Sequence, residues 1–122
     1  MNNTEVVNTT SKYIVKTTGI GSETNEIFVD ANDLTDGTNQ SLVSLIECYY
    51  LIEGTGTLTI DAASETETQA AGKTVAKPLS LTGKGKYGLR PGQLKYGEDK
   101  QFKITTDANV KSYLLVTEFR RN

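Results

Sequence analysis

Few side chains in this chain of 122 residues have the chemistry to act on a substrate. The chain contains no histidine and one cysteine, so the Ser-His-Asp and Cys-His arrangements of nucleophilic catalysis are excluded. Cys48 lies inside an apolar, β-prone run, where a thiol is most often an inert part of the core. A structural zinc site, which needs several cysteine or histidine ligands, is disfavoured for the same reason.

Two carboxylates, Glu47 and Glu53, are separated by an even number of positions and therefore share one face of a strand. Glycoside hydrolases use a pair of carboxylates in catalysis. On a strand, however, carboxylates are more often solvated or face a lysine of a partner protein, and we favour that interpretation. We therefore predict that the protein is not an enzyme and needs no cofactor.

A second group of acidic residues lies between Asp30 and Asp36, in a segment rich in Asp, Asn, Thr and Gly. Calcium binds oxygen ligands in loops, but this spacing differs from that of an EF-hand loop. Asx-type turns account for such a composition without a metal. We predict no metal site, and the sequence leaves open whether this loop binds calcium.

Cations and an aromatic residue alternate with glycines in Lys-Gly-Lys-Tyr-Gly-Leu-Arg, from Lys84 to Arg90. The segment lacks the Gly-Lys-Ser/Thr ending and the following helix of a phosphate loop, so we interpret it as a hairpin with a basic rim. Tyrosine and arginine are enriched in protein interfaces. We predict that seven residues contact a partner protein: Tyr13, Glu47, Tyr49, Lys84, Lys86, Tyr87 and Arg90.

Composition and charge narrow the class of protein further. The formal net charge of −2 argues against nucleic-acid binding as the main function. No segment has the length and apolarity of a membrane helix, and the first residues lack the features of a signal peptide. A single cysteine precludes an internal disulfide, which suits assembly in a reducing cytoplasm.

Turn signals divide most of the chain into short β-prone segments, and no segment has a convincing helical pattern. This pattern predicts an all-β fold with a single domain, either an antiparallel β-sandwich or a jelly-roll-like barrel. The domain is expected to span residues 12–122 and to follow an extended N-terminal arm over residues 1–11. The strands are predicted at Lys12–Thr18, Glu26–Val29, Leu42–Glu53, Thr57–Asp61, Val75–Leu81, Lys86–Arg90, Gln101–Thr105 and Val110–Phe119.

The segment from Leu42 to Asp61 is the longest apolar, β-prone run in the chain. Gly54–Gly56 fits a hairpin loop between its two strands. Both faces of the first strand are largely apolar, which is typical of a strand in the middle of a sandwich or against a partner. One face has Leu42, Ile46, Cys48, Tyr50 and Ile52, and the other has Val43, Leu45, Tyr49 and Leu51.

The segment Tyr50–Asp61, Tyr-Leu-Ile-Glu-Gly-Thr-Gly-Thr-Leu-Thr-Ile-Asp, resembles the first strand pair of small cupins. Cupins are β-barrels that hold a metal with histidines and a glutamate. The resemblance covers only this hairpin, and the absence of histidine means that cupin catalysis does not carry over. It implies, as an alternative function, a small-ligand-binding protein with an open pocket lined by Tyr50, Glu47 and Glu53.

Four segments, residues 12–21, 43–50, 79–92 and 113–121, carry a broader resemblance, to small virion proteins of tailed bacteriophages. These are all-β proteins, of which several decorate or cement the capsid. It implies a virion structural protein at the capsid surface, assembled in the host cytoplasm, that binds and stabilises the lattice of the major capsid protein. A homo-oligomer, trimer or dimer, is expected, without nucleic-acid or membrane partners; a tail or neck protein is the alternative.

Overall fold

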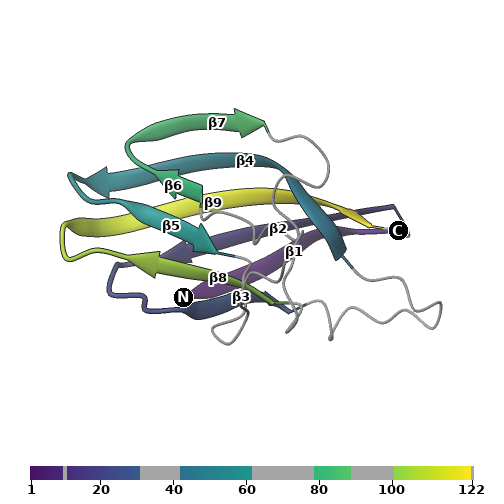
Figure 1. Ribbon diagram of the computed structural model, residues 1–122, viewed down its shortest axis with the longest axis horizontal. Helices are drawn as coiled ribbons and strands as arrows, with labels where there is room; N and C mark the ends of the chain where they lie inside the picture. Colours follow the sequence, from purple (N-terminus) through teal and green to yellow (C-terminus); the bar gives the residue numbers. More distant parts are fainter. Residues whose placement is uncertain (10, 31–41, 62–78, 89–100, 122) are drawn as a thin grey trace, which may run out of the picture.

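The protein is built from two antiparallel β-sheets packed against each other, as the computed structural model in Figure 1 shows. The structure describes residues 1–9, 11–30, 42–61, 79–88 and 101–121, and these contain no helix. In sheet A the order of strands is β1 (Asn2–Asn8), β2 (Lys12–Gly19), β9 (Val110–Arg121), β4 (Leu42–Gly54) and β7 (Lys84–Gly88). In sheet B it is β3 (Glu26–Asp30), β8 (Gln101–Thr106), β5 (Leu58–Asp61) and β6 (Leu79–Leu81).

The chain changes sheet six times, after β2, β3, β4, β6, β7 and β8. The crossovers after β2, β4, β6 and β8 lie at one end of the sandwich, on the left of Figure 1. The strands β2-β9-β4-β7 of sheet A therefore pack against the strands β3-β8-β5-β6 of sheet B. This is the arrangement of a jelly roll. The predicted all-β sandwich is confirmed, with two open sheets rather than a closed barrel. Of the predicted strand Val75–Leu81, the structure shows Leu79–Leu81 as β6, and residues 75–78 lie outside the described residues.

The predicted hairpin within Leu42–Asp61 is wrong. β4 pairs with β9 and β7 in sheet A, whereas β5 pairs with β8 and β6 in sheet B. Gly54–Gly56 therefore carries the chain from one sheet to the other. A hairpin and a crossover both join two strands with one core-facing side, so the apolar pattern alone does not distinguish them.

Residues 1–11, predicted as a separate arm, form part of the sandwich instead. Most of them build β1, which pairs with β2 from Asn2 opposite Thr18 to Asn8 opposite Tyr13. The side chains of β1 are exposed apart from a half-buried Val7. A polar segment joins a sheet in this way because the ladder is made by backbone N–H and C=O groups, which every such segment carries.

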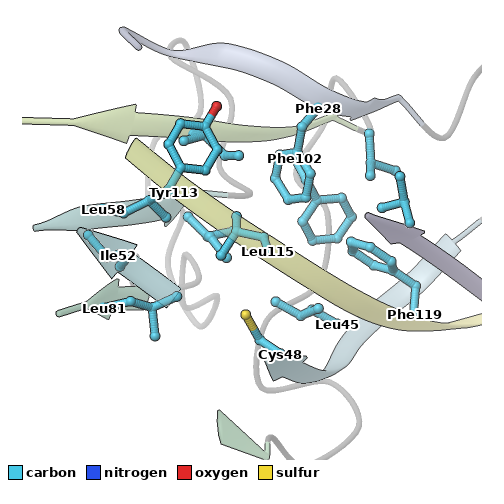
Figure 2. Close-up of a cluster of buried hydrophobic side chains, with 14 of the residues drawn as sticks. Phe28, Leu45, Cys48, Ile52, Leu58, Leu81, Phe102, Tyr113, Leu115 and Phe119 are labelled. Atoms are coloured by element: carbon cyan, nitrogen blue, oxygen red, sulfur yellow. The ribbon is translucent and has the colours of Figure 1, made fainter. Parts of the chain in front are cut away.

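The core lies between the sheets (Figure 2), and its aromatic rings gather around Phe119 of β9. The ring of Phe119 meets that of Phe102 nearly edge to face, with centroids 4.8 Å apart. The ring centroids of Tyr13 and Phe28 lie 6.2 and 6.4 Å from that of Phe119. These separations are in the range that aromatic pairs prefer. The other buried apolar residues are Val15, Val29, Leu45, Cys48, Ile52, Leu58, Ile60, Leu81, Ile104, Val110, Tyr113 and Leu115.

The pairing of β4 with β9 is irregular between Leu45 and Glu47. A bulge of this kind changes which side of the strand faces the core. Leu45 and Cys48, three positions apart, are consequently both fully buried. The predicted grouping of Leu45 with Tyr49 is therefore wrong, because strict alternation holds only on one side of the irregularity.

The crossover after β4 packs against the turn between β8 and β9. Asp107 accepts hydrogen bonds from the backbone N–H groups of Thr57 and Asn109, each at 2.9 Å. Gly54 has a positive φ of 99°, and a Cβ at this position would collide with the carbonyl oxygen of Asn109. Position 54 therefore requires glycine both for its backbone conformation and for the close approach of the two turns.

We predict that Gly54→Ala lowers the free energy of unfolding by at least about 3 kcal/mol, because backbone strain and a collision add. The matched control is Gly83→Ala, where φ is 69° but no atom lies within 4 Å of an added Cβ. That change should cost only about 1 to 2 kcal/mol. Urea denaturation measures both, and equal losses would contradict the role of the close approach.

Replacing Phe119 by alanine should destabilise the protein by about 3 to 5 kcal/mol, the usual cost of removing a buried phenylalanine. Tyr49→Ala serves for comparison because its side chain is 47% exposed. We expect it to cost about 1 kcal/mol or less. The same denaturation experiment compares the two variants, and a similar loss for both would show that Phe119 is not a main contributor to the core.

Candidate interaction surface

The face of sheet A that points away from the core carries exposed apolar side chains. Tyr49 and Leu51 of β4 are 47% and 42% exposed. Strand pairing places Tyr49 beside Val116 and Leu51 beside Leu114, both half-buried on β9. Ile14 of β2 lies diagonally across from Val116 and is half-buried as well. We call these five residues the outer stripe: Ile14, Tyr49, Leu51, Leu114 and Val116.

Charged side chains surround the outer stripe. Lys84 and Lys86 of the edge strand β7 lie opposite Leu51 and Tyr49, and Lys16 of β2 lies opposite Val116. The described residues give this face five cations and three carboxylates, a net charge of +2, whereas the whole chain carries −2. The cations are Lys12, Lys16, Lys84, Lys86 and Arg120, and the carboxylates are Glu47, Glu53 and Glu118.

Lys86 connects a carboxylate and an aromatic ring on this face. Its Nζ lies 2.7 Å from Oε1 of Glu47 and 5.3 Å from the centroid of the Tyr49 ring. The hydrogen bond to Glu47 is the main reason that the pKa of Lys86 is raised above its ordinary value. Because Lys86 is exposed, these contacts orient the three side chains more than they stabilise the fold. The lysine that faces Glu47 thus comes from its own chain.

Four of the seven predicted partner-binding residues share this face: Glu47, Tyr49, Lys84 and Lys86. Tyr13 does not lie on the surface; it is 8% exposed and packs in the core, so its predicted role is corrected. Tyr87 is exposed but pairs with the core-facing Cys48, which places it on the opposite side of β7 from Lys86. Arg90 lies outside the described residues.

Leu51, Leu114, Val116 and Lys16 were missed as candidate surface residues. The alternation within β9 does separate Leu114 and Val116 from the buried Leu115. The register of β2, β9 and β4 brings these residues together with Tyr49. The sequence of one strand alone does not determine that register.

The pocket that the cupin resemblance implied is not formed by its three residues. Glu47 and Glu53 lie on the outward side of β4, facing away from sheet B. Tyr50 points to the other side, where a Cβ on Gly85 would lie 3.2 Å from its hydroxyl oxygen. The two carboxylates and the tyrosine therefore cannot line one cavity.

Other candidate sites have structural explanations where the structure describes them. Asp30 accepts a hydrogen bond from Nε2 of Gln101 at 3.3 Å, and the rest of the acidic loop lies outside the described residues. No three His, Cys, Asp or Glu side chains in the described ranges lie together as metal ligands. The same ranges contain no helix long and apolar enough to cross a membrane.

Two of the ionisable groups buried in the sandwich have raised pKa values. Cys48 lies beside Leu45 in the core (Figure 2), and burial raises the pKa of its thiol to about 12. The hydroxyl of Tyr113 donates a hydrogen bond to Oε1 of Glu23 at 3.0 Å, and burial is the main cause of its raised pKa. Glu23 is also tied to Thr106 through its backbone N–H, at 2.9 Å. These contacts fix the crossover between β2 and β3.

Comparisons of the chain with protein-family models, with curated proteins and with solved structures find no significant match.

The raised pKa of Cys48 predicts that stability falls as the pH rises through the alkaline range. An unfolded thiol ionises near its ordinary value of 9.0, whereas the folded one keeps its proton up to about 12. Between these two pH values the unfolded state therefore binds fewer protons than the folded state. The stability that the buried thiol contributes is complete below pH 9 and is progressively lost above it. The raised pKa of Tyr113 has the same effect on stability, which begins as the pH rises through the ordinary pKa of tyrosine, 10.0.

Cys48→Ala should therefore flatten the decline of the unfolding free energy with pH above 9, although it lowers the stability at pH 7. Urea denaturation at a series of pH values measures this slope. Leu51→Ala, which removes no ionisable group, is the control, and its slope should follow that of the unmodified protein. An unchanged slope in the cysteine variant would show that the thiol ionises in the folded state.

Proposed function

We propose that this protein is a non-enzymatic structural protein of a virus particle, a capsid decoration or cement subunit that docks through the outer face of sheet A. The observation that carries the proposal is the outer stripe, in which Tyr49 and Leu51 stay exposed in the interior of a sheet rather than at its rim. Single exposed apolar residues are ordinary, whereas a continuous patch across three strands is typical of an interaction site.

The edges of the sheets support docking through a face. An unprotected edge strand invites pairing with another chain. β1 and β3 each contain a register irregularity, β6 has three residues, and β7 carries Lys84 and Lys86. Bulges, shortness and lysines are the usual means of blocking edge pairing. A partner is therefore expected to contact side chains of a sheet face instead of adding a strand.

The fold and the chemistry agree with a structural role. Jelly rolls occur in viral capsid proteins, lectins and cupins, so the fold permits this function without determining it. The one cysteine is buried, and Glu47 is paired with Lys86. The specific assignment to the capsid rests on the resemblance to small phage virion proteins, and the major capsid protein is the proposed partner.

A surface of modest size suffices for such a role. Many copies on a lattice, or an oligomer of this chain, act together, so weak individual contacts add to strong attachment. A subunit that binds the assembled lattice and not the separated capsid subunits stabilises the lattice by mass action. We expect the protein to act in this way, as a homo-oligomer on the capsid surface.

Co-sedimentation with empty capsids, built from the major capsid protein encoded in the same genome, tests the proposal. We expect saturable binding with a fixed stoichiometry and a higher melting temperature of the capsid. Leu51→Ser should weaken binding about tenfold, whereas Ile27→Ser should not, because Ile27 is equally exposed, at 41%, but lies on sheet B. Absence of binding, or immunogold labelling of a tail or neck, would refute a capsid role.

A further inference from the structure

We infer that the outer face of sheet A recognises an acidic protein surface with an apolar centre, into which the ring of Tyr49 inserts. The inference rests on the proposed function for the identity of the partner, but its physical basis is separate. It follows from the charge on this face, from the arrangement around Tyr49 and from the poor fit of this face to a second copy of itself.

The charge of the face is opposite in sign to that of the molecule. The face carries +2 on its described residues, while the chain as a whole carries −2. Two of its five cations are already engaged, Lys12 with Glu118 at 3.4 Å and Lys86 with Glu47 at 2.7 Å. The remaining three form no ion pair with another described residue and flank the outer stripe: Lys16, Lys84 and Arg120. Complementary charges on a partner would be carboxylates around an apolar patch.

Tyr49 has the properties of an anchor residue. Tyrosine presents a large amphipathic ring with only two side-chain torsions, so it loses little conformational freedom on binding. Lys86 lies over the ring and is itself held by Glu47, which restricts the ring before any partner arrives. An anchor that is already oriented binds more tightly than a mobile one.

A second copy of the chain is a poor occupant of this face. Two copies facing each other through it are related by a two-fold axis in the plane of contact. An axis across the strands places β7 over β7, and Lys86 of one copy approaches Lys86 of the other. An axis along the strands places β7 over the β1–β2 side, which carries Lys16. Both arrangements bring like charges together, whereas an acidic partner removes the repulsion.

Binding to the empty capsids at increasing NaCl concentration provides the first test. Affinity should fall with salt, because exposed charges contribute. Lys16→Glu combined with Lys84→Glu should weaken binding at least tenfold. Lys111→Glu, an exposed lysine at the start of β9 that is paired with no residue of the outer stripe, should weaken it less. Tyr49→Ala should weaken it at least tenfold and Tyr49→Phe much less. Tyr87→Ala is the matched control, since Tyr87 is 39% exposed on the other side of β7.

A second test does not depend on the capsid. Poly-L-glutamate is titrated into the isotope-labelled protein at low salt while backbone amide resonances are followed by NMR. We expect shifts confined to β2, β4, β7 and β9, which the double lysine variant abolishes, and poly-L-lysine should not reproduce this pattern of shifts. Shifts centred on sheet B, or equal shifts in the lysine variant, would overturn the inference.

The outcomes separate this inference from the proposed function. Capsid binding that is unaffected by salt and by the lysine and Tyr49 variants would overturn the inference and leave the function intact. Failure to bind capsids, together with poly-L-glutamate shifts on the predicted face, would refute the function and support the inference. A dimer that Tyr49→Ala converts to a monomer in sedimentation velocity would show that this face binds a second copy, and the inference would be wrong.

Discussion

The packing of β9 against sheet B is central to the structure of this protein. β9 lies in the middle of sheet A, between β2 and β4, and its inward residues, above all Phe119, fill the space between the sheets. Because successive side chains of a strand point to opposite faces, burying Leu115 forces Leu114 and Val116 outward. The apolar surface of the protein is thus a direct consequence of how its core is filled.

The strands and the fold class could be predicted from local patterns, since β-branched and aromatic residues in β9 alternate over a long segment bounded by turn residues. Which strands pair with one another could not be predicted in this way. The run through Gly54 has the composition of a hairpin, but the collision that a side chain at 54 would make with Asn109 belongs to a turn more than fifty positions away. β1 was misjudged for a different reason: it is held by backbone hydrogen bonds, which leave no trace in its polar side chains.

The candidate surface was predictable only in part. Glu47, Tyr49, Lys84 and Lys86 were found because their residue types suit an interface, and the structure brings them together through the pairing of β4 with β7. Residue type gave the wrong answer for Tyr13, because an aromatic ring on a strand serves a core as readily as an interface. Only the side of the strand distinguishes the two, and register determines that side.

The parallel course of β1 and β9 on either side of β2 has a mechanical consequence. β1 starts at the crossover end of the sandwich, whereas β9 finishes at the opposite end (Figure 1). Tension applied between these two places pulls the strands lengthwise past β2. The backbone hydrogen bonds that join β2 to β1 and to β9 are then all loaded at once. When a strand is instead peeled from its end, these bonds break one after another. The sandwich is therefore oriented to resist stretching along its long axis.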